Sequence, residues 1–333
     1  MSGAGLSGVG PDSQPKPKGS KKVLSGKSRA AAVSVASNSL LILLKIIAGI
    51  MTGSISLIAE AIHSLMDLAA AIVAFFSVRI SDKPADKEHP FGHGKAENIS
   101  GVVEAILIFI AAGIIIDQAI MRIINGQALK ILEIGIAIMV VSIVVNILVS
   151  RYLIKVSRAT DSLALEADAA HITTDVLTMS GVLVGLVIVR VTKLMGFNLN
   201  ILDPIVAILV SLLIIRTAYV LTRKAFGGLI DVKLPENEET NIRLAITEHF
   251  GGEVVSFHKL RTRKAGSQRY IDLHLVMPKH ISIEEAHRMC DHLEKDMKTR
   301  LLRTDITIHV EPCDGKCEVC RIKCDKRQGK VSV

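Results

Sequence analysis

His63-Ser64-Leu65-Met66-Asp67 stands inside an otherwise apolar run at residues 55–78, and His171-Ile172-Thr173-Thr174-Asp175 stands inside another at 163–189. Each stretch reads His-x-x-x-Asp, a spacing that places imidazole and carboxylate one turn apart on one face of a helix. Two such helices facing each other supply two nitrogens and two carboxylate oxygens, which suits tetrahedral Zn²⁺. The alternative is that the four side chains only hydrogen-bond to one another. Because each carboxylate at the bilayer centre costs about 2.5–3.5 kcal/mol on insertion scales, the metal role is favoured.

Four further apolar runs accompany these two, and together they predict six transmembrane helices. Half of the 333 residues are hydrophobic, only 3% are aromatic, and the mean hydropathy is +0.44, which excludes a soluble globule, collagen and a disulfide scaffold. Each run approaches the roughly 20 residues that a helix needs to cross the bilayer. None shows the two-residue alternation of a barrel strand. The runs lie at about 30–51, 55–78, 98–121, 131–153, 163–189 and 202–222.

Lysine and arginine gather on one side of these runs. They flank the first run on its amino side and fill the connections after the second and fourth runs, whereas the opposite connections carry few. By the positive-inside rule, both termini and the hydrophilic carboxyl end are predicted to be cytoplasmic, in a multi-pass protein of the cell membrane. Since topology explains the formal net charge of +8, nucleic-acid binding is not expected.

The composition divides the chain into four predicted parts. After Gly227-Gly228 it turns soluble, and residues 269–277 alternate in the manner of a half-buried strand. Helices predicted at 235–250 and 283–301, with further strands at 254–262 and 305–311, give the order α-β-β-α-β and a small open-faced α+β sandwich. The parts are a disordered basic tail (1–28), a six-helix transmembrane domain (29–226), a cytoplasmic domain (227–312) and a Cys-rich tail (313–333).

Other groups carry weaker signals. The loop residues Asp86, His89 and His93 could close on one ion with water as a fourth ligand, or remain idle in a solvated loop. Glu60 and Asp168 precede the two membrane histidines by three residues, so they either orient an imidazole or relay protons, or they only meet water near the membrane boundary. Four polar residues in apolar runs have no partner that the sequence can name: Asn38, Lys45, Glu104 and Asp117.

The carboxyl-terminal part holds scattered histidines and all five cysteines. Sequence spacing alone cannot unite its histidines, which lie on different predicted strands and a helix. The Cys-x-x-x-Cys-x-x-Cys-x-x-x-Cys tail can hold a thiolate-bound metal or carry free thiols, because disulfides are disfavoured in a reducing compartment. These tail residues are Cys313, Cys317, Cys320 and Cys324.

From about residue 30 to 312 the chain resembles the cation diffusion facilitator family of metal/proton antiporters. The likeness rests on the two His-x-x-x-Asp stretches, the loop His89-Pro90-Phe91-Gly92-His93-Gly94-Lys95-Ala96-Glu97 and the stretch His258-Lys259-Leu260-Arg261-Thr262-Arg263, in that order. The resemblance implies a homodimer whose ferredoxin-like cytoplasmic domains associate through bound metal. It also implies that cytoplasmic divalent metal leaves in exchange for entering protons.

The resemblance also assigns residues to sites. His63 stands where many bacterial members have Asp, and imidazole favours Zn²⁺ over Mn²⁺ without excluding Cd²⁺, Co²⁺ or Fe²⁺. Glu311 stands where relatives have Asp. The implied sets are His63, Asp67, His171 and Asp175 for transport; Asp86, His89 and His93 for a loop site; His258, His274, His287, His309 and Glu311 for a cytoplasmic binuclear site; and Lys95 with Asp231 for a salt bridge at the membrane-cytoplasm junction of the dimer.

The predicted function is therefore a Zn²⁺/H⁺ antiporter that exports zinc, with Zn²⁺ as substrate and as regulatory ion. Protons and Zn²⁺ compete for the same His and Asp side chains, which couples their movements. An enzyme is not expected, because four protein ligands leave no open position for water or substrate. The alternatives are transport of Cd²⁺, Co²⁺ or Fe²⁺ by the same mechanism, a membrane-bound zinc sensor that moves nothing, and a six-helix channel.

Overall fold

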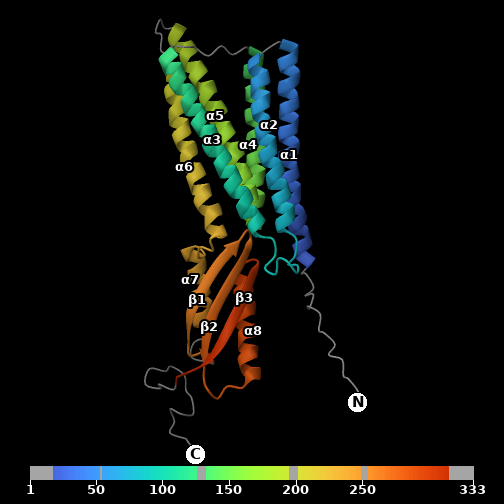
Figure 1. Ribbon diagram of the computed structural model, residues 1–333, viewed down its shortest axis with the longest axis vertical. Helices are drawn as coiled ribbons and strands as arrows, with labels where there is room; N and C mark the ends of the chain where they lie inside the picture. Colours follow the sequence, from blue (N-terminus) through green and yellow to red (C-terminus); the bar gives the residue numbers. More distant parts are fainter. Residues whose placement is uncertain (1–17, 53–54, 126–132, 195–201, 249–253, 315–333) are drawn as a thin grey trace, which may run out of the picture.

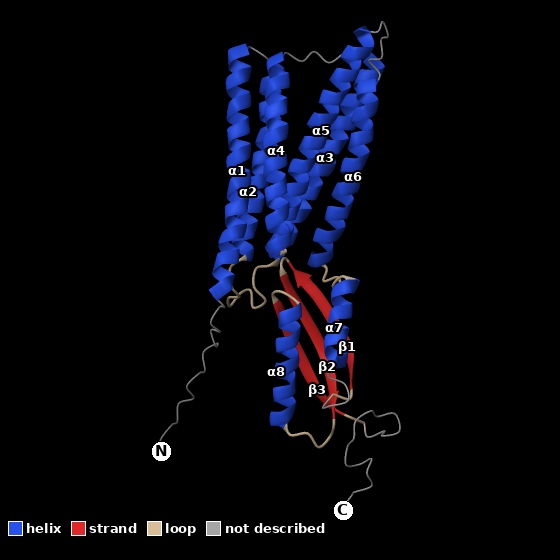
Figure 2. Cartoon of the chain, turned by 180° about the vertical axis from the view of Figure 1, so that it is seen from behind, coloured by secondary structure: helices blue, strands red, loops and turns tan. Residues whose placement is uncertain are grey.

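The computed structural model describes residues 18–52, 55–125, 133–194, 202–248 and 254–314. Within them, six long helices form a bundle, and a domain of two shorter helices and three strands is attached to one end of it (Figures 1 and 2). The start of α1 and the end of α6 both lie at that end. The long helices are α1 (Lys18–Thr52), α2 (Ile55–Ser81), α3 (Lys95–Asn125), α4 (Glu133–Thr160), α5 (Leu163–Leu194) and α6 (Leu202–Leu229).

Five helices of the described chain are long and apolar enough to cross a membrane: α1, α2, α3, α4 and α6. Their outer faces expose large apolar side chains such as Leu43, Phe76 and Leu213, as expected of surfaces that meet lipid. The predicted sixth span, α5, is a helix of 32 residues but is not in that set. In the first half of α5, Asp168 and His171 are buried.

Helix α1 begins at Lys18, inside the segment that the composition predicts to be a disordered tail. Pro17 is the last proline before it, so no residue after that point interrupts the helical hydrogen bonds. The side chain of Lys27 is fully buried and bonds to Glu97, which lies seventy residues further along the chain. This contact holds α1 in place at Lys27, just before its apolar run.

Helix α5 lies between two groups of helices. Leu165 and Ile172 pack in one apolar cluster with residues of α1, α2 and α4, while Ala167 packs in a second cluster with Ile108 of α3 and Ile214 of α6. Towards the end remote from the small domain, α3, α5 and α6 lean away from α1, α2 and α4 (Figures 1 and 2). The polar stripe of α5 therefore meets α2 on one side and α3 on the other.

The small domain confirms the predicted α-β-β-α-β order. It consists of α7 (Glu236–Glu248), β1 (Ser256–Ala265), β2 (Gln268–Met277), α8 (Ile283–Arg300) and β3 (Thr304–Pro312). Strand β2 is central, antiparallel to β1 and parallel to β3, and α8 provides the crossover that a parallel pair requires. Both helices cover one face of the sheet (Figure 2), where Ile246, Leu273 and Leu293 are buried. Neither of these two helices covers the opposite face of the sheet.

The turn between β1 and β2 contacts the start of α3. The Gly266 N–H donates to Asn98 Oδ1 at 2.7 Å, and Asn98 Nδ2 donates to the Ala225 carbonyl at 3.1 Å, so one side chain ties the turn to α3 and α6. Gly266 has a φ of +58°, and a Cβ there would overlap the carbonyl of Gly94. Only glycine permits this close approach.

Gly266→Ala is expected to destabilise the protein, whereas Gly113→Ala within α3 is not. The left-handed conformation alone costs a non-glycine residue about 1–2 kcal/mol, and the overlap with Gly94 adds to it. A Cβ at Gly113 meets no atom within 4 Å, and alanine gains about 1 kcal/mol of helix propensity. Thermal unfolding in detergent should therefore shift in opposite directions for the two variants. Equal shifts would contradict the role given to the turn.

Candidate metal sites

The structure brings three predicted membrane ligands together. Asp67 of α2 and His171 and Asp175 of α5 each offer a ligand atom within 4.8 Å of the others. His171 Nε2 lies 3.2 Å from Asp67 Oδ1, and the three residues line a cavity of about 30 Å³ whose other walls are largely apolar. A water-poor pocket with two carboxylates and an imidazole is a suitable place to hold a small dehydrated cation.

The other predicted membrane residues are less informative. The side chains of His63 and Glu60 lie outside the part of α2 whose side chains are described. Asp168 lies one turn before His171, and its side chain is buried rather than open to water. Its Oδ2 has no hydrogen-bond partner within the described residues.

Glu104 of α3 also lies at this site, although sequence reasoning gave it no partner. Its Oε2 is 3.7 Å from His171 Nδ1, on the side of the ring opposite Asp67. The available signal was a lone carboxylate on the same helical stripe as Leu107, Ile108 and Ala111, which line the cavity.

The loop before α3 forms a second, exposed cluster. Asp86, His89 and His93 offer ligand atoms within 4.8 Å of one another, with Asp86 Oδ1 3.2 Å from His89 Nδ1 and Asp86 Oδ2 3.3 Å from His93 Nε2. The backbone N–H of His89 donates to Asp86 at 2.7 Å and lowers the pKa of that carboxyl. The carboxylate is thus held in its ligating form.

A third cluster lies on the open face of the small domain. His258, His274 and His309 are neighbours across β1, β2 and β3 in the strand register. Glu311 joins them, with Oε1 2.6 Å from His274 Nδ1 and Oε2 3.2 Å from His258 Nε2. The hydrogen bond with His274 lowers the pKa of the Glu311 carboxyl.

His287 is not brought to this cluster within one chain. It lies on α8, on the other side of the sheet, and its Nε2 is 3.7 Å from Asp291. Of the four tail cysteines only Cys313 is among the described residues, and it is free. Cys317, Cys320 and Cys324 lie outside the described residues, so the tail site remains a prediction.

Lys95 and Asp231 lie at the junction of the two domains, where Lys95 Nζ is 3.0 Å from Asp231 Oδ1. Arg263 of β1 contacts the same oxygen at 3.4 Å. Partial burial acts to raise the pKa of Asp231, but the two cations outweigh it and hold that pKa below its ordinary value.

A buried polar network occupies the same junction. Glu97 of α3 is fully buried and accepts from Lys27 Nζ at 2.9 Å, from Ser81 Oγ at 2.9 Å and from the hydroxyl and backbone N–H that open α5. Lys27 also donates to Ser267 in the turn between β1 and β2. The sequence motif contained Glu97 but offered no sign of these partners.

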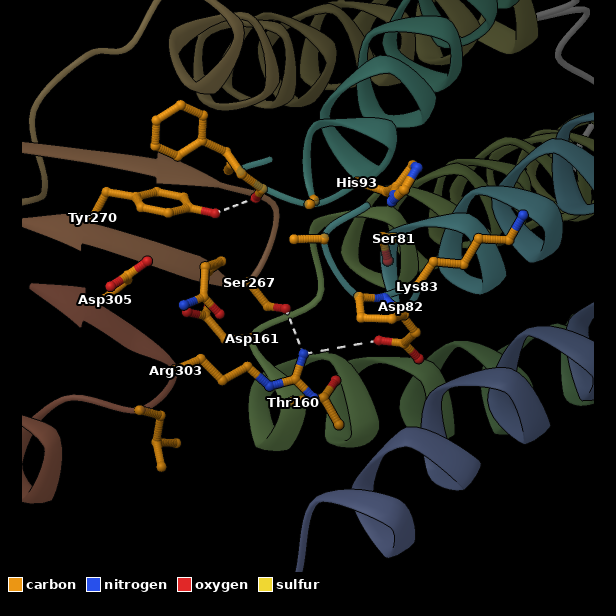
Figure 3. Close-up of a pocket in the computed structure, with 18 of the residues that line it drawn as sticks. Ser81, Asp82, Lys83, His93, Thr160, Asp161, Ser267, Tyr270, Arg303 and Asp305 are labelled. Atoms are coloured by element: carbon orange, nitrogen blue, oxygen red, sulfur yellow. Dashed lines mark hydrogen bonds and ion pairs between the residues drawn. The ribbon is translucent and has the colours of Figure 1, made fainter. Parts of the chain in front are cut away.

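Beside this network lies a cavity of about 570 Å³, bounded by the loop before α3, the end of α4 and the small domain. Figure 3 shows Arg303 reaching across it to Ser267 and to Asp82. Burial raises the pKa of Asp82 and outweighs the attraction of Lys27 and Arg303. The small domain is therefore joined to the bundle by polar side chains around a hollow rather than by a continuous apolar core.

Comparison with known proteins gives the context for these sites. Residues 31–230 match the family model of the cation efflux transmembrane domain, and residues 234–313 match that of the cation efflux protein cytoplasmic domain. An uncharacterized transporter of Synechocystis is 35% identical over 271 residues, which are 81% of this chain and 86% of the relative. The cation-efflux pump FieF of Serratia proteamaculans is 33% identical over 284 residues, which are 85% of this chain and 92% of that protein.

Among solved structures, the fragment described as "Mode of Action of a Putative Zinc Transporter CzrB (Zn form)" is 38% identical. It covers 25% of this chain and 93% of its own, with a TM-score of 0.24.

The chain combines a multi-pass helical domain with a cytoplasmic α+β domain, and it matches cation efflux proteins over most of its length. These features define a membrane transporter of divalent cations rather than an enzyme. The matches to cation efflux proteins indicate that the transporter moves cations by efflux. The chain belongs to the cation efflux, or cation diffusion facilitator, family.

Proposed function

We propose that the chain is a Zn²⁺/H⁺ antiporter that exports zinc from the cytoplasm across the cell membrane. The observation that carries this proposal is the meeting of Asp67, His171 and Asp175 at one small cavity between α2 and α5. His63, four residues before Asp67, is proposed as the fourth ligand. Imidazole ligands favour Zn²⁺ over harder ions such as Mn²⁺.

Exchange follows from the chemistry of the ligands. A His or Asp side chain must be deprotonated to bind a metal ion, so a proton arriving from outside displaces zinc and returns on the vacated side chain. Helix α5 is proposed as a sixth span: its 32 residues reach roughly 48 Å, and its buried polar face is turned away from lipid. With six spans, both termini lie on the same side of the membrane, and the carboxyl-terminal domain makes this the cytoplasmic side.

The protein is proposed to act as a homodimer, which the match of residues 234–313 to the cytoplasmic domain model supports. The loop cluster and the cytoplasmic cluster are proposed to sense zinc and to bias the membrane domain towards export. His287 lies on α8, outside the cytoplasmic cluster of its own chain, so a second copy is proposed to supply it to such a site.

The test is metal uptake by proteoliposomes across Zn²⁺, Cd²⁺, Co²⁺, Fe²⁺ and Mn²⁺, with and without a pH gradient. We expect saturable zinc flux that the gradient accelerates. Flux that neither saturates nor responds to pH would indicate a channel, binding without flux would indicate a sensor, and preference for another ion would replace zinc as the substrate.

The cytoplasmic cluster gives a separate prediction. His274→Ala is expected to lower the number of zinc ions bound by the full-length protein in detergent, whereas His292→Ala on the exposed side of α8 is not. Lowering the pH from about 7 to about 5.5 should release the same ions, because protons compete with zinc for the imidazole nitrogens. Glu311 remains ionised over that range because its pKa is lowered. Equilibrium dialysis measures both effects, and unchanged stoichiometry in His274→Ala would exclude this site.

A further inference from the structure

Glu104 of α3 is a buried acidic residue next to the transport site, and the ligand set leaves its carboxylate unused. Its side chain is fully buried in α3, and neither of its oxygens has a hydrogen-bond partner among the described residues. An unpaired carboxylate within a membrane helix is costly to keep. We therefore expect the carboxylate of Glu104 to gain a hydrogen-bond partner when the protein binds its ion.

The position of Glu104 identifies that partner as His171. The Glu104 Oε2 atom lies 3.7 Å from His171 Nδ1, which also lacks a hydrogen bond within the described residues. The other ring nitrogen, Nε2, faces Asp67 at 3.2 Å. The two nitrogens of one imidazole thus face two different carboxylates.

Glu104 cannot hold the same ion as a direct ligand in this arrangement. Atoms of Asp67, His171 and Asp175 converge within 4.8 Å, and Glu104 is not in that group. An ion bound to Nε2 lies across the imidazole ring from Glu104. A closure of about 0.5 Å brings Nδ1 and Oε2 within hydrogen-bonding distance.

We infer that Glu104 is a positioning residue of the transport site, which accepts the Nδ1–H of His171 and thereby presents the Nε2 lone pair to the ion. This inference rests on the proposed transport function. A carboxylate behind a metal-bound imidazole fixes the tautomer and the ring orientation and makes the nitrogen a stronger ligand. This role also explains why the Glu104 carboxylate and His171 Nδ1 are both buried without a hydrogen bond: the two groups bond to each other when the ion is bound.

The test compares Glu104→Gln and Glu104→Leu with Asp117→Asn, an exposed carboxylate of the same helix. The zinc concentration for half-maximal flux in proteoliposomes should rise by about 10–100-fold for Glu104→Leu, the usual effect of losing such a partner. It should rise less for Glu104→Gln, whose amide oxygen still accepts the Nδ1–H. Asp117→Asn should match the parent.

A second measurement separates positioning from a purely structural role. Thermal unfolding of the zinc-free protein should be unchanged or shifted upwards in Glu104→Leu, because an unpaired buried charge is removed, while zinc affinity falls. Stability and affinity falling together, or kinetics equal to those of Asp117→Asn, would overturn the inference. A parent protein that transports no zinc would contradict the proposed function, and this outcome is distinct from those that contradict the role of Glu104.

Discussion

Replacing His171 by alanine is expected to abolish zinc-driven proton flux in proteoliposomes. The imidazole is the single proposed nitrogen ligand in the described part of the membrane cluster, and its Nε2 lies 3.2 Å from Asp67. Because loss of an outer partner already weakens a metal site by about 10–100-fold, loss of the ligand itself should exceed that range. Asp67→Asn and Asp175→Asn should act in the same way, since an amide does not supply a negative charge to the ion.

The control for this prediction is His280→Ala, an exposed histidine of the cytoplasmic domain, which should transport as the parent does. Zinc flux and internal pH are recorded together, so that coupling is measured as well as rate. Flux that persists in both His171→Ala and Asp67→Asn would exclude the membrane cluster as the transport site. Zinc flux that persists without proton movement would exclude antiport.

The helical bundle was largely predictable because lipid leaves few structures for an apolar run. The runs near residues 98–121 and 202–222 could only be helices. The buried position of Lys27 in α1 was not predictable, because it depends on a contact with Glu97, seventy residues away, which no local sequence pattern contains. The α+β domain was predictable from alternation and helical spacing, which are local properties.

The candidate sites were also predictable only in part. The spacing of His171 and Asp175 placed both on one face of one helix, so their meeting followed from the sequence. The pairing of His274 with Glu311 required the register between β2 and β3, which alternation does not contain. Glu104 required the packing of α3 against α5. Contacts within an element were therefore predictable, whereas contacts between elements needed the fold.

Glu97→Gln is expected to destabilise the protein by about 3–5 kcal/mol, the usual cost of removing one partner of a buried ion pair. Lys27 has no exposed surface, so its ammonium would remain buried after the change. Asp82 is the other carboxylate nearby, 3.7 Å from Lys27 Nζ, and burial already raises its pKa. Asp82 is therefore a poor replacement for Glu97.

The expected damage extends beyond the ion pair. Glu97 Oε1 accepts from Lys27, while Oε2 accepts from Ser162 Oγ and from the backbone N–H of Leu163. Glutamine keeps one amide oxygen, and the buried Lys27 ammonium needs it, so the Leu163 N–H at the start of α5 would face an NH2 group that cannot accept from it. Helix α5 carries His171 and Asp175. Zinc flux at limiting zinc should therefore fall together with stability, because the ligands are held by a helix whose start has loosened.

The matched control is Glu166→Gln, which makes the same change in an exposed ion pair at the start of α5. Glu166 bonds to Lys224 at 2.8 Å, and both side chains are nearly half exposed, so its loss should cost no more than about 1 kcal/mol. Lys27→Met combined with Glu97→Gln removes both charges and should recover part of the stability lost in the single variant. Thermal unfolding in one detergent is compared for the parent, the single variants Glu97→Gln, Lys27→Met and Glu166→Gln, and the double variant. A Glu97→Gln protein as stable as Glu166→Gln, or a double variant with purely additive losses, would show that this buried pair does not stabilise the protein.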